Sequence, residues 1–64
     1  MEAQADILGN AVAAYSELEE LREVARDVDT DEAWDACGAQ HKRMLVFTQQ
    51  LDNKHFRLYF AYMD

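Results

Sequence analysis

Apolar residues in the first half of the chain recur at alternating steps of four and three, the spacing of one face of an α-helix. The series consists of Ile7, Ala11, Ala14, Leu18, Leu21, Ala25 and Val28. Gly9 and Asn10 interrupt the good helix formers near the start, so the regular helix could begin only at Asn10, a favourable N-cap residue. The pattern predicts an amphipathic helix over residues 3–28 that carries a heptad seam.

A second helical pattern follows the sequence Asp-Val-Asp-Thr, which is rich in turn and cap formers. Asp29 and Glu32 have the spacing of a capping box, which predicts a helix that begins near Asp31. The spacing of the apolar residues then fits a helix as far as about Leu51, unless Gly38 ends it early. These apolar residues are Ala33, Trp34, Cys37, Met44, Phe47 and Leu51.

The last third of the chain has two interpretations. In the first, Asp52 and Asn53 end the second helix, and a short third helix capped by Asn53 covers residues 54–63. In the second, Asp52 and Asn53 form the two-residue turn of a β-hairpin, one face of which carries alternating apolar residues. Those residues are Phe56, Leu58, Phe60 and Tyr62. The missing turn glycine and the marginal stability of a lone two-stranded ribbon favour the helix.

The predicted fold is therefore all-α, in one small domain of 64 residues. It is a helical hairpin of residues 3–28 and 31–51 with a short aromatic-rich C-terminal helix or tail; the alternative is an α+β fold ending in the β-hairpin. A chain of this length buries only about 60% of its unfolded surface. Cys37 has no second cysteine with which to form a stabilising disulfide. A homodimer is therefore the expected source of additional stability.

Charge is divided unevenly along the chain. Residues 1–35 carry 11 of the 13 acidic residues and a net charge of −9, whereas residues 36–64 carry +2. The overall charge of −7 repels phosphate backbones and anionic lipids, so direct binding to nucleic acid or to a membrane is not expected. The acidic start does not resemble a targeting peptide, and a single thiol suits a reducing compartment. These features predict a cytoplasmic protein.

Candidate catalytic and metal-binding residues are few. Cys37 and His41 lie four residues apart on one face of a predicted helix, and His55 lies close to Asp52. Either pair could contribute to a zinc site, but a structural site needs four ligands, and a buried thiol and a solvated histidine are the simpler interpretation. The sequence contains none of the common phosphate-binding or catalytic motifs. No enzymatic activity, cofactor or metal is therefore expected.

The first candidate contact surface is the acidic face of the first helix. It consists of Glu17, Glu19, Glu20, Glu23 and Asp27. Like charges four residues apart cost a helix a few tenths of a kcal/mol, so this face is not arranged for helix stability alone. It is either a solvated surface or a recognition surface for a basic patch on a protein partner, where its carboxylates would compete with nucleic acid.

The second candidate contact surface is the aromatic C-terminal segment. Its proposed contact residues are Phe56, Tyr59, Phe60, Tyr62 and Met63. A helix over this segment is apolar nearly all round, and one small domain is not expected to cover it fully. The excess is expected to bind a protein partner or a second copy of the chain.

These features predict a non-enzymatic protein that acts through protein–protein interaction, as a small regulator or inhibitor. Phage-type factors that take over a host or counter its defences are the analogy for such a protein. The alternative is a structural or chaperone-like helical subunit that is stable mainly within an oligomer or complex. In that alternative the apolar seam of the first helix carries the function, and the acidic residues only maintain solubility.

Overall fold

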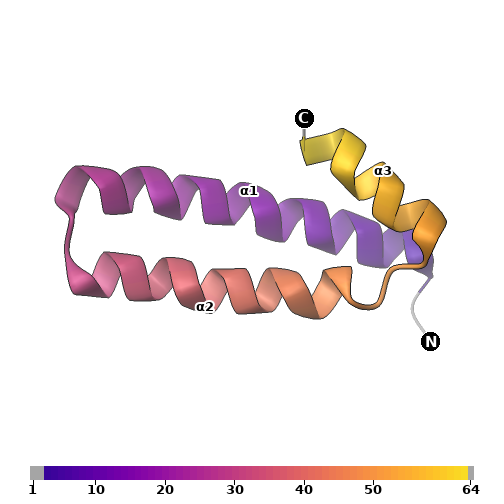
Figure 1. Ribbon diagram of the computed structural model, residues 1–64, viewed down its shortest axis with the longest axis horizontal. Helices are drawn as coiled ribbons and strands as arrows, with labels where there is room; N and C mark the ends of the chain where they lie inside the picture. The colour runs from indigo at the N-terminus through magenta and orange to yellow at the C-terminus, as the bar shows by residue number, and fades with distance from the viewer. Residues whose placement is uncertain (1–2, 64) are drawn as a thin grey trace.

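The computed structural model describes residues 3–63, which form three helices (Figure 1). Helix α1 spans Gln4–Val28, α2 spans Asp31–Thr48 and α3 spans Asn53–Met63. α1 and α2 lie side by side in opposite directions, and α3 packs over the N-terminal half of α1 on a different side from α2. Residues 3–63 contain no β-strand, so the all-α prediction is confirmed and the alternative hairpin with its turn at Asp52–Asn53 is wrong.

α1 begins earlier than the glycine and asparagine near its start suggested. The first helical residue is Gln4, after Ala3 as N-cap, so the possible start at Asn10 is wrong. Gly9 lies inside the helix, where it costs about 1 kcal/mol relative to alanine. The packing of Leu8 and Ala11 against α3 stabilises these first turns. Tertiary contacts therefore outweigh the weak local propensity.

Asp29 and Thr30 form the whole connection between α1 and α2. Asp29 adopts the left-handed conformation, with φ 48° and ψ 50°, and its N–H donates to the carbonyl of Ala25 at 2.8 Å. Thr30 is the N-cap of α2, because its Oγ1 accepts a hydrogen bond from the N–H of Ala33 at 3.3 Å. The predicted capping box with Asp29 as its cap is therefore wrong, because the cap lies one residue later, at Thr30. The Asp29 carboxylate instead accepts from the indole N–H of Trp34 at 3.0 Å.

Two apolar clusters hold the helices together. The first joins α1 to α2 through Leu18, Ala25 and Cys37, with Leu21, Ala33 and Met44 packed against them. The second joins α1 to α3 through Leu8, Ala11 and Tyr59, with Val12, Tyr15, Phe47, Leu51 and Met63 packed against them. The predicted seam of α1 is buried or half-buried from Ile7 to Ala25, whereas Val28 is exposed. The second cluster fixes the position of α3 on α1.

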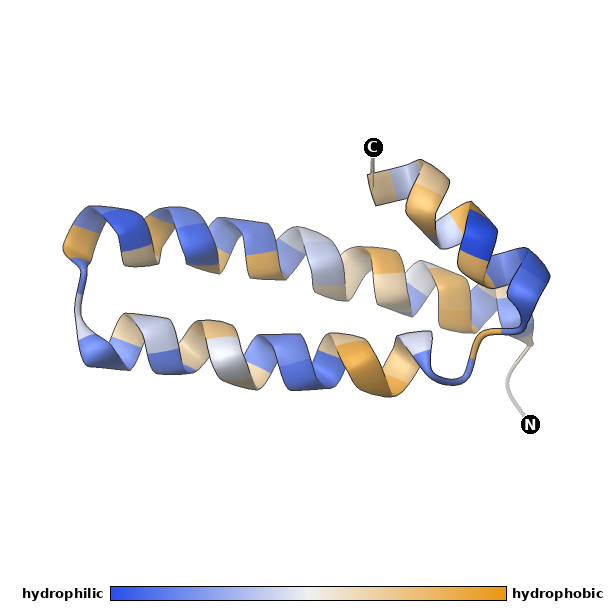
Figure 2. Ribbon diagram, viewed as in Figure 1, coloured by the Kyte–Doolittle hydropathy of each residue, from blue (hydrophilic) through white to orange (hydrophobic). Residues whose placement is uncertain are grey.

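Apolar residues gather toward the end of the molecule that carries α3, and the other end of the α1–α2 pair is mostly hydrophilic (Figure 2). α2 ends at Thr48, three residues before the predicted boundary at Leu51, and continues through Gly38 without a break. Within residues 3–63, no helix combines the length and the apolar character that crossing a membrane requires.

Candidate protein-binding surfaces

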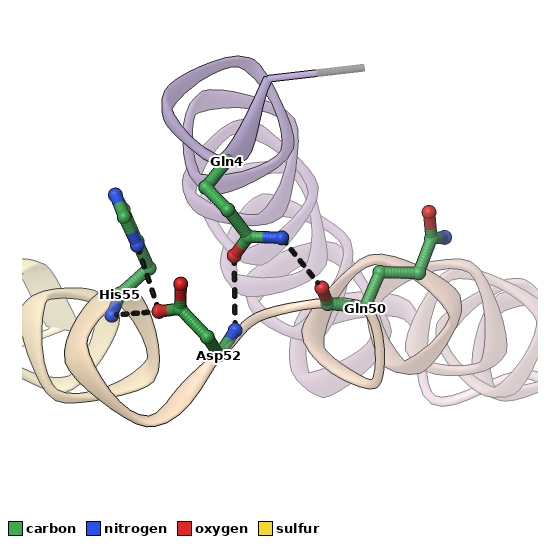
Figure 3. Close-up of polar contacts among 4 residues, drawn as sticks. All are labelled: Gln4, Gln50, Asp52 and His55. Atoms are coloured by element: carbon green, nitrogen blue, oxygen red, sulfur yellow. Dashed lines mark hydrogen bonds and ion pairs between the residues drawn. The ribbon is translucent and has the colours of Figure 1, made fainter. Parts of the chain in front are cut away.

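The side-chain amide of Gln4 fixes the linker between α2 and α3 (Figure 3). Its Nε2 donates to the carbonyl oxygen of Gln50 at 3.0 Å, and its Oε1 accepts from the N–H of Asp52 at 2.9 Å. A primary amide donates and accepts at once, so one side chain satisfies two backbone groups of the linker. These bonds hold the start of α3 beside the first turn of α1.

Asp52 is the cap of α3, one residue before the predicted cap, Asn53, which is the first residue of the helix. Its Oδ1 accepts from the N–H of His55 at 2.8 Å and lies 2.8 Å from His55 Nδ1 (Figure 3). The bond from the His55 backbone, with a further contribution from the imidazole, lowers the pKa of Asp52 below its ordinary value of 3.8. The cap therefore stabilises the fold above pH 3.8, and this contribution is lost as the pH falls through the folded-state pKa.

We expect both the donor and the acceptor of the Gln4 amide to stabilise the fold. Gln4→Ala should lower the free energy of unfolding by about 1–2 kcal/mol, because two backbone groups lose their partner. Gln4→Glu keeps an acceptor for the N–H of Asp52 but places an oxygen against the carbonyl of Gln50. At pH 7 the free energy of unfolding of Gln4→Glu should therefore be close to that of Gln4→Ala. At pH 3 the protonated carboxyl can donate to the carbonyl of Gln50, so part of the stability lost relative to the unaltered chain should return.

Urea unfolding followed by circular dichroism measures these effects, with Gln49→Ala as the matched control. Gln49 is an exposed glutamine in the same linker, and within residues 3–63 its side chain forms no hydrogen bond. An equal loss in Gln4→Ala and Gln49→Ala would contradict the role assigned to Gln4.

α3 presents a wider apolar surface than α1 covers. Tyr59 faces α1 and is 3% exposed. Because successive helical residues are about 100° apart, two side chains flank Tyr59 on each side: Phe56 and Phe60 on one, Leu58 and Tyr62 on the other. Their exposed fractions are 37% for Phe56, 51% for Phe60, 42% for Leu58 and 67% for Tyr62. We call these four residues the α3 apolar surface.

The aromatic rings of α3 pack on one another as well as on α1. Phe56 and Phe60 meet edge to face with ring centroids 4.8 Å apart, and Tyr59 meets Tyr15 of α1 edge to face at 6.4 Å. Met63 is half-buried in the cluster around Tyr59. Of the five predicted aromatic-face residues, Tyr59 and Met63 therefore hold α3 in place, and the other three remain accessible to a partner.

An open groove of about 370 Å³ lies between α1 and the end of α3. Its lining is apolar and consists of Ala5, Leu8, Gly9, Val12 and Tyr62. The space at Gly9 is open, because a Cβ at this position would meet no atom within 4 Å. The groove continues the α3 apolar surface onto α1.

The acidic residues of α1 lie in different environments. Glu19 forms an ion pair with Arg22 at 2.8 Å. Glu17 Oε2 accepts at 3.1 Å from the side-chain amide of Gln40, which reaches across from α2. The remaining three are exposed and, within residues 3–63, form no side-chain hydrogen bond or ion pair; they are Glu20, Glu23 and Asp27. We call these three residues the acidic strip.

Gln40 is a structural residue that the sequence interpretation missed. It is buried, and its Nε2 also donates to the carbonyl oxygen of Ala14 at 3.0 Å, so it joins α2 to α1 at two points. The available signal was its position between Cys37 and Met44, in steps of three and four along the apolar stripe of α2. A polar residue in such a stripe needs a partner once it is buried.

Cys37 is buried in the first cluster, whereas His41 is exposed. In the part of the chain that the structure describes, no three His, Cys, Asp or Glu side chains are grouped to hold a metal ion. Comparison of the chain with protein families, with curated proteins and with solved structures finds no match. The α3 apolar surface, the groove and the acidic strip are the exposed features open to contact with another molecule.

Proposed function

We propose that this chain is a non-enzymatic regulator or inhibitor that acts by binding another protein. The α3 apolar surface carries this proposal, because Phe56, Leu58, Phe60 and Tyr62 remain exposed around a single buried tyrosine. Exposed apolar residues are ordinary when they are scattered, but these four lie on one short helix beside an apolar groove. Tyrosine and phenylalanine are also enriched where proteins bind one another.

The acidic strip supports the proposal that the partner carries a basic patch beside the apolar site that contacts α3. Glu20, Glu23 and Asp27 are exposed carboxylates on one face of α1. Carboxylates in such an arrangement accelerate association with a cationic surface and exclude anionic competitors. A basic surface that otherwise binds nucleic acid would suit the strip, and its occupation would inhibit that binding.

The alternative function, as a structural or chaperone-like subunit, has less support. It assigns binding to the apolar seam of α1, but Ala14, Leu18 and Ala25 of this seam are buried within the chain. Binding through the seam would require α2 to separate from α1, which would expose the first cluster and break the bonds of Gln40.

Partner capture with paired surface variants tests the proposed function. We expect Phe60→Ser with Tyr62→Ser to reduce capture at least tenfold, because exposed aromatic residues at an interface act as anchors. Lysine at all three positions of the acidic strip should weaken capture most strongly at low salt. Val46→Ser is the matched control, since Val46 of α2 is 57% exposed and lies outside both surfaces. Capture that neither surface variant changes would refute the assignment.

A further inference from the structure

The C-terminal half of α1 and the outer side of α3 carry opposite charges. Residues 53–63 include Lys54 and Arg57 and no acidic residue. Both cations are exposed on the side of α3 away from Tyr59. The small residue Ala61 follows them on the same side, near the end of the helix. Phe60 and Leu58 border this side. The outer side of α3 is therefore basic at its centre and apolar at its edges.

The acidic strip has the complementary character. Glu20, Glu23 and Asp27 lie on one line along α1, at steps of three and four. Val24 and Val28 border the strip and are about half exposed, at 52% and 53%. The C-terminal half of α1 therefore offers carboxylates beside apolar side chains, the counterpart of the outer side of α3.

The strip also continues the face of α1 on which the groove lies. Ala5, Gly9 and Val12 line the groove, and the same helical line passes through exposed Ser16 to the acidic strip. α3 lies over only the N-terminal half of α1, so the exposed face of residues 16–28, away from α2, has no covering element (Figure 1). The uncovered part, residues 16–28, is about 19 Å long, and α3 is about 16 Å long. The uncovered face of α1 thus matches α3 in length.

The geometry points to a second copy of this chain as the partner that covers this face of α1. In an antiparallel dimer with its two-fold axis near Ser16, α3 of each copy lies over residues 16–28 of the other. Lys54 and Arg57 then meet the acidic strip of the second copy, and the contact is made twice, as two-fold symmetry requires. α3 is covered on both sides, by Leu8 and Ala11 of its own chain and by the strip of the second copy.

The dimer is independent of the proposed function, but it affects the binding of the protein partner. The dimer covers the acidic strip and the outer side of α3 with its bordering residues Leu58 and Phe60, and the strip and these two residues are also assigned to the protein partner. Binding of the partner and dimerisation therefore compete. A dimer of this kind also buries apolar side chains that a chain of 64 residues leaves exposed, Val24, Val28 and Phe60 among them.

Sedimentation equilibrium of the purified chain with reversed charges tests the dimer. Lys54→Glu with Arg57→Glu should raise the dimer dissociation constant at least tenfold, and so should Glu20→Lys with Glu23→Lys and Asp27→Lys. An equimolar mixture of these two variants should restore association, because both contacts of the mixed dimer again pair opposite charges. Lys42→Glu with Arg43→Glu, on α2, is the charge-matched control and should change nothing.

Circular dichroism shows whether each variant is folded. The mixture is then the decisive measurement, because only complementary surfaces associate again on mixing. A chain that stays monomeric at millimolar concentration would overturn the dimer, and so would equal dissociation in the α2 control or no recovery in the mixture. A dimer that Tyr62→Ser alone weakens would support it, because Tyr62 lies at the end of α3 nearest the axis. If the chain is monomeric and still captures a partner, the dimer is wrong and the proposed function stands. If the chain dimerises and captures no partner, the dimer stands and the proposed function is wrong.

Discussion

Leu18→Ala is expected to lower the free energy of unfolding by about 3 kcal/mol, most of the stability of a chain this small. Leu18 is 1% exposed and is the largest fully buried side chain between residues 3 and 63. It packs with Ala25 and Cys37 where α1 meets α2, and the small neighbours cannot fill the space that the substitution leaves. Part of the loss is therefore the cost of a cavity.

Urea unfolding of Leu18→Ala beside Leu45→Ala measures this effect under matched chemistry. Leu45 lies on α2 and is 39% exposed, so its truncation should cost less than about 1 kcal/mol. A similar loss in the two variants would mean that the α1–α2 contact is not the main source of stability.

Tyr59→Ala is the second large effect that we expect, at about 3 kcal/mol, and it should be confined to α3. Tyr59 is the buried residue of α3, and α3 packs mainly on α1. Loss of its ring should release α3 and leave α1 and α2 paired. Hydrogen exchange is the direct measurement: amides of α3 should lose protection, while those near Leu18 should keep it.

Tyr59→Phe is the control, because it keeps the ring and removes a hydroxyl that is buried without a hydrogen-bond partner in residues 3–63. We expect it to be neutral or to add up to about 1 kcal/mol. Burial, with a further contribution from Tyr15, raises the pKa of Tyr59 above its ordinary value of about 10. Its contribution to stability is complete below that value and is lost as the pH rises through the folded-state pKa. Tyr59→Phe should therefore unfold less readily in alkali than the unaltered chain, and equal alkaline unfolding would contradict this account.

The parts of the fold that could be predicted from the sequence depend on local periodicity. The seam of α1 was identified because its apolar steps are regular from Ile7 to Ala25. The end of α2 and the cap of α3 were misplaced by one to three residues, because adjacent polar residues such as Asp52 and Asn53 have almost equal capping preferences. A choice between such neighbours depends on the His55 and Gln4 bonds, which form only in the folded chain.

The candidate surfaces were predictable as segments but not in their separate roles. Glu17 and Glu20 look equivalent in the sequence, yet Glu17 accepts a hydrogen bond from Gln40, 23 residues away, and Glu20 remains exposed. Gln4 is likewise an ordinary helix residue until the chain returns to it at Gln50. Long-range partners of this kind leave no periodic signal, and they decide which side chains hold the fold and which remain for binding.

The two-residue connection at Asp29 and Thr30 also predicts the order in which the chain folds. Closing so short a loop costs little chain entropy, so contacts between the end of α1 and the start of α2 form first, and pairing then extends from the connection toward Leu8. The contacts of α3 with the start of α1 join residues about 50 positions apart and form last. We therefore expect folding to proceed from the acidic end of the molecule to the aromatic end, with the aromatic surface completed last.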